Sequence, residues 1–218
     1  MEGEPAEVFR AVVLTDSNGR DIGPDDIKAH IPKDQRGRYD IKVVVGYTLI
    51  EVWDKLERGV LQVEGETVIL DVGTNDVRGT GKVPQSGPGD VGWRFERVGR
   101  LLFEKGAVGL VACKLKPMSF MDVAPYSWAI HSACLRLRTH GHRVHGCMTQ
   151  TCVSHLRKDG YHILPSFSTV LDMTYACAIR GIPVPCPATW ERGQDPALKD
   201  RWPTPREAQG RGKNHGRG

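Results

Sequence analysis

A serine follows a short apolar run near the start of the chain. Ser17 lies just beyond Val12–Leu14, within the stretch AVVLTDSNG. An apolar run of this length, bounded by turn-forming residues, predicts a buried strand. Open α/β sheets bind their ligands outside the carboxyl ends of the strands. Ser17 is therefore the first candidate for a reactive group.

A nucleophilic serine needs a base and donors for the developing negative charge. Late in the chain, the stretch DGYH offers His162 as the base and Asp159 to orient its imidazole. The backbone N–H groups of Ser17 and Gly46 and the side-chain amide of Asn75 are candidate oxyanion donors. Together these residue types predict acyl transfer through an activated serine.

Alternating strands and helices would have to position these residues. We expect strands at 8–14, 41–45, 67–72, 107–112 and 143–147, and helices at 48–58, 91–105, 127–138 and 166–179. We expect loops at 21–40, 78–90 and 114–126. This alternation predicts an α/β protein with a mostly parallel five-stranded sheet covered on both faces. The candidate residues follow its strands, or precede its last helix, and so gather at one edge.

These blocks resemble those of the SGNH (GDSL-like) hydrolase superfamily. The matching stretches are TDSN at 15–18, Gly46, GTND at 73–76 and DGYH at 159–162, in the family's order between about residues 8 and 182. The resemblance implies a flavodoxin-like three-layer α/β/α sandwich and a serine esterase with a catalytic triad and an oxyanion hole. It also implies that no metal or organic cofactor is needed and that the partner is a small ester substrate.

The sequence also departs from the family pattern. Thr15 stands where the family has glycine, and the second block is reduced to Gly46 alone. We expect Asp16, Gly73 and Asp76 to support the site through turns and hydrogen bonds rather than to catalyse. The G-x-S-x-G elbow of the larger α/β-hydrolases is absent from the sequence, which disfavours that fold.

Other interpretations of the same residues stay open. Ser17 could cap a helix, Asn75 could belong to a simple turn, and Asp159 could start a surface turn. Some SGNH-like domains have lost activity and serve as binding modules. The alternative function is therefore an inactive SGNH-like module that binds nucleic acid or protein, of a kind that also occurs in mobile genetic elements.

A cluster of histidine and cysteine residues gives a competing metal-site hypothesis. Its members are His140, His142, His145, Cys147, Cys152 and His155. Their spacing matches no standard zinc finger, so we expect no metal here.

Composition limits the class of protein. The 218 residues carry 30 Lys and Arg against 26 Asp and Glu, a net charge of +4 that does not by itself predict nucleic-acid binding. We expect a short tail at 1–7, one domain at 8–182 and a disordered Pro, Gly and Arg-rich extension at 183–218. No stretch has the length of a membrane span, and the acidic N-terminus lacks a signal core. We therefore expect a cytoplasmic or nuclear protein whose six cysteines are free thiols.

Overall fold

A computed structural model describes the fold over residues 8–79, 85–147 and 155–182. Within these ranges, five parallel strands form one sheet in the order β2-β1-β3-β4-β5. The strands are β1 (Phe9–Thr15), β2 (Tyr39–Val45), β3 (Thr67–Asp71), β4 (Gly109–Cys113) and β5 (Val144–Cys147). The predicted parallel sheet is confirmed, so all these strands end at the same edge.

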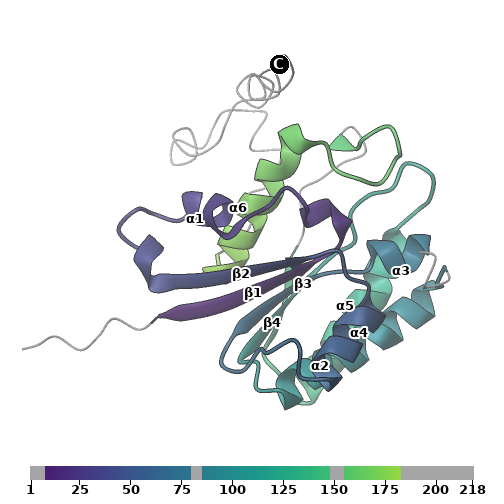
Figure 1. Cartoon of the computed structure of the whole chain (residues 1–218). Helices are drawn as coiled ribbons and strands as arrows, with labels where there is room; N and C mark the ends of the chain where they lie inside the picture. The colour runs from purple at the N-terminus through teal and green to yellow at the C-terminus, as the bar shows by residue number, and fades with distance from the viewer. Residues whose placement is uncertain (1–7, 80–84, 148–154, 183–218) are drawn as a thin grey trace, which may run out of the picture.

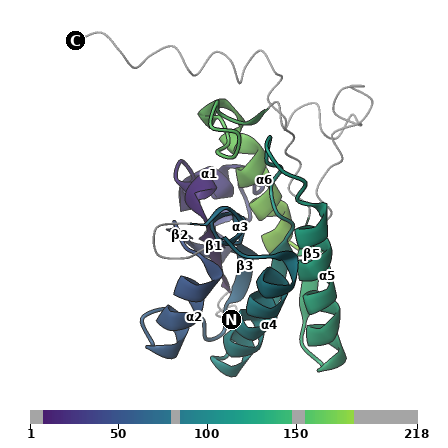
Figure 2. The ribbon, with the colours of Figure 1, turned by 90° about the vertical axis from the view of Figure 1, so that its right-hand side faces the viewer.

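Helices cover both faces of the sheet (Figures 1 and 2). On β1, Val12 and Leu14 belong to one buried apolar cluster, and Val13 belongs to another. This alternation assigns the helices to two outer layers. The first cluster is covered by α2 (Leu49–Glu57), α4 (Pro88–Glu104) and α5 (Ala124–Thr139), and the second by α1 (Pro24–Ala29) and α6 (Ser168–Ile179). The α/β/α sandwich predicted from the sequence is therefore confirmed.

The start of α2 is set by its own sequence. The Glu51 N–H donates to Thr48 Oγ1 at 3.2 Å, and the Thr48 N–H donates to Glu51 Oε2 at 2.9 Å. This capping box satisfies N–H groups that have no partner inside the helix. Val52 and Leu56 are fully buried on the inner face of the helix. The cap and this apolar face hold the beginning of α2 close to the carboxyl end of β2.

Two short helices lie where we expected irregular chain. The predicted 21–40 loop contains α1 and a 3-10 turn, η2 (Arg36–Arg38). Pro24 opens α1, Asp26 Oδ2 accepts a hydrogen bond from the Gly23 N–H directly before the helix, and Ile27 is fully buried. Burial of the Ile27 side chain stabilises this helix of six residues. Six residues are too few to show the apolar periodicity by which a helix is predicted from sequence. The second short helix, α3 (Thr74–Arg78), follows β3 in place of a simple turn.

The remaining boundaries differ from the predictions by a few residues. The fourth helix α4 already begins at Pro88, and residues 165–167 form a separate 3-10 turn, η4 (Pro165–Phe167), before α6. In the part of the chain that the structure describes, no helix is long and apolar enough to cross a membrane.

Candidate active site

A tight 3-10 turn, η1 (Ser17–Gly19), places Ser17 at the carboxyl end of β1. The Asp16 carboxylate caps this turn by accepting a hydrogen bond from the backbone N–H two residues further on, at 2.9 Å. A Cβ atom at Gly19 would overlap the Thr15 side chain. Glycine at position 19 therefore makes room for Thr15, the residue that replaces glycine in the family pattern.

Three side chains form a continuous hydrogen-bonded chain at this edge. Ser17 Oγ lies 2.8 Å from His162 Nε2, and His162 Nδ1 lies 2.8 Å from Asp159 Oδ2. The serine and the histidine are 145 positions apart in the sequence, so only the fold brings them together. His162 is 20% exposed, which leaves a solvent path to the ring. This is the arrangement in which an imidazole can take a hydroxyl proton while a carboxylate orients it.

The Asp159 carboxylate is held in its ionised form. Its other oxygen, Oδ1, accepts hydrogen bonds from the Tyr161 N–H at 3.1 Å and the His162 N–H at 3.0 Å. Burial by itself would raise the pKa of Asp159, but the hydrogen bonds from His162 and Tyr161 lower it to about 2. The group that orients the histidine is therefore negatively charged near neutral pH.

The side chain of Asn18, in the turn η1, also holds the loop that carries His162. Asn18 Oδ1 accepts a hydrogen bond from the Ile163 N–H at 2.8 Å, and Asn18 is almost fully buried. Ile163 in turn forms an isolated antiparallel bridge with Leu156. Ile163, the residue directly after His162, thus makes both contacts: one ties the loop to η1, and the other closes the loop upon itself.

The segment after β3 carries the proposed oxyanion donor. Gly73 has φ +137°, and a Cβ there would approach Leu115 Cδ2 to 2.8 Å, so the position requires glycine. Asn75 lies in the following helix α3 and is only 7% exposed, and the preceding strand β3 pairs with β1. The GTND block therefore lies at the same edge of the sheet as Ser17.

Asp76 fixes this segment to two other helices. Its Oδ2 accepts a hydrogen bond from the Leu49 N–H at 2.9 Å, and its Oδ1 lies 3.5 Å from an Arg94 nitrogen. Burial raises the pKa of Asp76 to about 6, although the Leu49 N–H and the Arg94 guanidinium act in the opposite direction. Asp76 is fully buried, and these contacts connect the start of α3 to α2 and α4.

Contacts among Arg78, Tyr161 and His162 bring α3 against the loop that carries His162. The Arg78 guanidinium lies 3.9 Å from the centroid of the Tyr161 ring. The Tyr161 and His162 rings have centroids 3.9 Å apart. Since Arg78 follows Asn75 by one helical turn, the Asn75 segment and the His162 loop meet across the site.

Gly46 does not fit the oxyanion role that we expected. Its N–H donates to the Thr15 carbonyl at 2.9 Å, which extends the pairing of β2 with β1. An N–H used in this way is not a free donor toward a substrate. We therefore correct the prediction and leave Gly46 out of the donor set. Its φ of +93° shows that the position needs glycine for the turn itself.

A buried lysine that could not be predicted from the sequence lies next to Asp16, the residue that caps the turn η1. Lys116 is 1% exposed, and its Nζ donates to Asp71 Oδ2 at 2.7 Å and lies 3.8 Å from Asp16 Oδ1. The Tyr175 hydroxyl donates to the same Asp71 oxygen. Although burial lowers the pKa of Lys116, the charges of Asp16 and Asp71 raise it above the usual value. The lysine thus neutralises carboxylates directly next to Ser17.

Three histidines of the His/Cys cluster contact aromatic or basic side chains. The His142 ring stacks on Phe103 at 4.3 Å, the His155 ring stacks on Phe167 at 4.1 Å, and His140 Nε2 lies 3.0 Å from Arg100. Over the described ranges, no group of three or more His, Cys, Asp or Glu side chains could hold a metal ion. Cys152 lies outside those ranges.

Comparison with known proteins yields structural likeness without sequence likeness. No protein-family model and no curated protein matches the sequence. A Clostridium thermocellum family 3 carbohydrate esterase superposes with a TM-score of 0.60 at 13% identity, covering 80% of this chain and 98% of the esterase. The acetyl xylan esterase AlAXEase gives 0.59 at 13% identity, covering 78% and 99%.

A third similar structure is a member of the lipolytic G-D-S-L family from Veillonella parvula. It superposes with a TM-score of 0.53 at 14% identity, covering 78% of this chain and 97% of that protein. At such identities the likeness concerns the fold, which spans nearly the whole length of each esterase. The chain has the α/β fold of the SGNH (GDSL-type) esterases.

Proposed function

We propose that the protein is a serine ester hydrolase that acts through an acyl-enzyme. One observation carries the proposal, namely the unbroken chain from Ser17 Oγ through the His162 ring to Asp159 Oδ2, with both contacts at 2.8 Å. A helix cap or a surface turn requires no such contact between residues so far apart in sequence. The esterase fold around these residues adds support.

In the acylation step, Ser17 Oγ attacks the ester carbonyl carbon while its proton passes to His162 Nε2. The tetrahedral intermediate then collapses, the bond to the alcohol oxygen breaks, and His162 returns the proton to the leaving alcohol. Water next attacks the acyl group with His162 again as the base, which releases the carboxylic acid and restores Ser17. Asp159 stabilises the imidazolium in both halves of the reaction.

Two donors would stabilise the oxyanion in each half-reaction. The Ser17 N–H lies in the first turn of η1, where backbone N–H groups have no partner within the helix. The side-chain amide of Asn75 is the second donor. Loss of one such donor typically costs about 10²–10³ in rate.

Lys116 would act beneath this machinery as a positioning residue. Asp16 precedes Ser17 directly and caps its turn, and it is completely buried. A buried carboxylate without a nearby cation would favour protonation or rearrangement. The Lys116 ammonium group is held by Asp71 and lies 3.8 Å from Asp16 Oδ1, so its positive charge faces the carboxylate that caps the turn and helps to keep the turn in place.

Hydrolysis of p-nitrophenyl acetate tests the proposal. The purified full chain is expected to release p-nitrophenolate with saturation kinetics, and Ser17→Ala is expected to reduce kcat by at least about 10³-fold. Ser168→Ala, which changes a serine at the start of α6, serves as the control and is expected to retain full activity. Equal turnover by Ser17→Ala and the unaltered chain would contradict the proposal.

The alternative, a module that binds nucleic acid or protein, receives no support from the described residues. The Pro, Gly and Arg-rich extension at 183–218 lies outside them.

A further inference from the structure

A half-open pocket lies between α2 and α4, away from the serine. Its volume is about 270 Å³. The side chains that line it include Leu49, Ile50, Trp53, Trp93, Arg94 and Arg97. We call it the α2–α4 pocket. Sites for drug-sized ligands typically measure about 300–1,000 Å³, so this pocket suits a smaller molecule.

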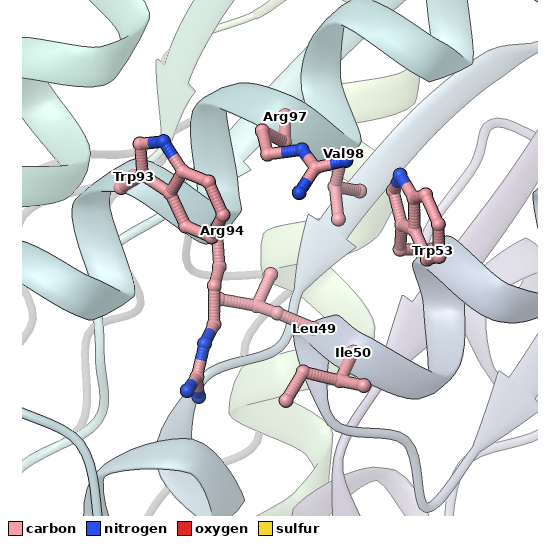
Figure 3. A pocket seen from close by; sticks show the side chains of 7 residues that line it. All are labelled: Leu49, Ile50, Trp53, Trp93, Arg94, Arg97 and Val98. Atoms are coloured by element: carbon pink, nitrogen blue, oxygen red, sulfur yellow. The ribbon is translucent and has the colours of Figure 1, made fainter.

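An arginine lies between two indole rings in this pocket, as Figure 3 shows. The Arg97 guanidinium carbon is 5.0 Å from the Trp53 ring centroid and 4.8 Å from that of Trp93. A guanidinium group that stacks on aromatic faces keeps its N–H edges available for hydrogen bonds. The two tryptophans therefore orient Arg97 without using its donors.

Arg97 has no acidic partner in the described part of the chain. None of the ion pairs found there includes it, whereas Arg100 on the same helix pairs with Glu96 at 2.8 Å. Arg94, the other cation of the pocket, is already bound to Ser86 at 2.6 Å and to Asp76. Among the described residues, the pocket thus contains one oriented positive group, Arg97, without an acidic counter-ion.

The walls around this charge are apolar and partly exposed to solvent. Trp93 is 56% exposed and Ile50 is 39% exposed, while Leu49 behind them is fully buried. Large exposed apolar side chains that gather around a concave site mark binding surfaces more often than inert ones. A ligand that fits needs a flat apolar body for the indoles and one planar anion for Arg97.

We propose that the α2–α4 pocket binds a small aromatic carboxylate. A carboxylate matches the two parallel N–H groups of a guanidinium edge, and an aromatic body can stack on the exposed Trp93 face. The pocket also adjoins the segment that carries Asn75, since Leu49 and Arg94 both contact Asp76. The binding proposal does not depend on the proposed ester hydrolysis.

Titration of the ¹⁵N-labelled full chain with 2-naphthoate tests this proposal, with the tryptophan indole N–H resonances as reporters. Trp53→Phe and Trp93→Phe assign two of the signals. Naphthoate is expected to shift the Trp53 and Trp93 signals in a saturable way and to leave that of Trp128, 69% exposed on α5, in place. The same shifts are expected in Ser17→Ala, which separates this site from the catalytic one.

Two comparisons make the test specific for charge. Naphthamide, which has the same body without the charge, and the Arg97→Gln variant are each expected to weaken binding at least about tenfold. Arg100→Gln, one turn further along α4, is the matched control and is expected to bind naphthoate normally. Equal affinity for naphthamide, unchanged binding by Arg97→Gln, or the absence of shifts at Trp53 and Trp93 would each overturn the proposal.

Discussion

The side-chain oxygen of Asn18 accepts a hydrogen bond from the backbone N–H of Ile163 at 2.8 Å. These residues directly follow Ser17 and His162, respectively. The bond therefore joins the two loops that carry the candidate nucleophile and its base. It explains how groups from opposite ends of the domain can lie 2.8 Å apart.

Replacement of Asn18 tests the importance of this joint. Asn18→Ala removes the acceptor, and we expect kcat/KM for p-nitrophenyl acetate to fall about 10–100-fold because the base loses its position. Asn18→Asp keeps an acceptor oxygen and is expected to retain more activity than the alanine variant. Steady-state kinetics with circular dichroism as a folding control provide the measurement. Full activity of Asn18→Ala would show that the joint is dispensable.

Loss of Lys116 should destabilise the protein strongly. Lys116→Met leaves two buried carboxylates, Asp16 and Asp71, without their cation. Breaking a buried ion pair typically costs about 3–5 kcal/mol, and we expect this loss in the free energy of unfolding measured with urea. The double variant Lys116→Met/Asp71→Asn is expected to recover part of it, because one stranded charge is also removed. A loss below about 1 kcal/mol in the single variant would contradict this view.

Glycine at position 160 should be required for activity. Gly160 has φ +78°, and a Cβ there would overlap Ser119 Oγ, so in Gly160→Ala either the Ser119 side chain or the Asp159–His162 turn has to shift, and we expect the strained turn to move. Gly141→Ala is the matched control, since Gly141 has φ +82° with no atom within 4 Å of the added Cβ. We expect both variants to lose about 1 kcal/mol of stability through backbone strain. Only Gly160→Ala is expected to lose ester hydrolysis, and equal activities would refute the prediction.

A buried carboxylate on α6 should make stability depend on pH. Burial, with a smaller effect of the Asp26 charge, raises the pKa of Asp172 to about 7, and its Oδ1 has no hydrogen-bond partner among the described residues. An unfolded aspartate has a pKa near about 3.9. Between these values the folded state holds the additional proton, so the free energy of unfolding falls as pH rises from about 4 to 7.

Asp172→Asn removes this dependence. We expect the variant to resemble the unaltered chain near pH 4 and to be more stable by on the order of 2 kcal/mol at pH 8. Urea unfolding at several pH values measures the effect, with the exposed Asp25→Asn on α1 as the control. A variant that is less stable than the unaltered chain at pH 8 would contradict the prediction.

The strands and long helices could be predicted because their apolar periodicity is strong. The apolar run at Val12–Leu14 is distinctive because turn-forming residues follow it directly. The amphipathic pattern of α4 is distinctive because it extends over 17 residues. The short helix α1 escaped prediction, since its formation depends on burial of Ile27 against α6, which no local pattern indicates. Tertiary contacts outweighed the polar composition of that segment.

The candidate site shows the same division. Ser17, Asp159 and His162 could be selected by residue type and block order, and the structure brings them within hydrogen-bond distance. The engagement of the Gly46 N–H depends on strand register. The role of Lys116 depends on its burial against Asp71 and Asp16, whereas in sequence the stretch KLKP resembles a charged surface loop.

Covalent labelling with a fluorescent fluorophosphonate tests the central claim most directly, because the probe reacts with an activated serine whatever the substrate. We expect the unaltered chain to be labelled, Ser17→Ala not to be labelled, and His162→Ala and Asp159→Asn to be labelled at least about 100-fold more slowly. Mass spectrometry should locate the adduct on Ser17. A folded, unaltered chain that resists the probe, or labelling that persists in Ser17→Ala, would contradict the assignment of Ser17 as the nucleophile.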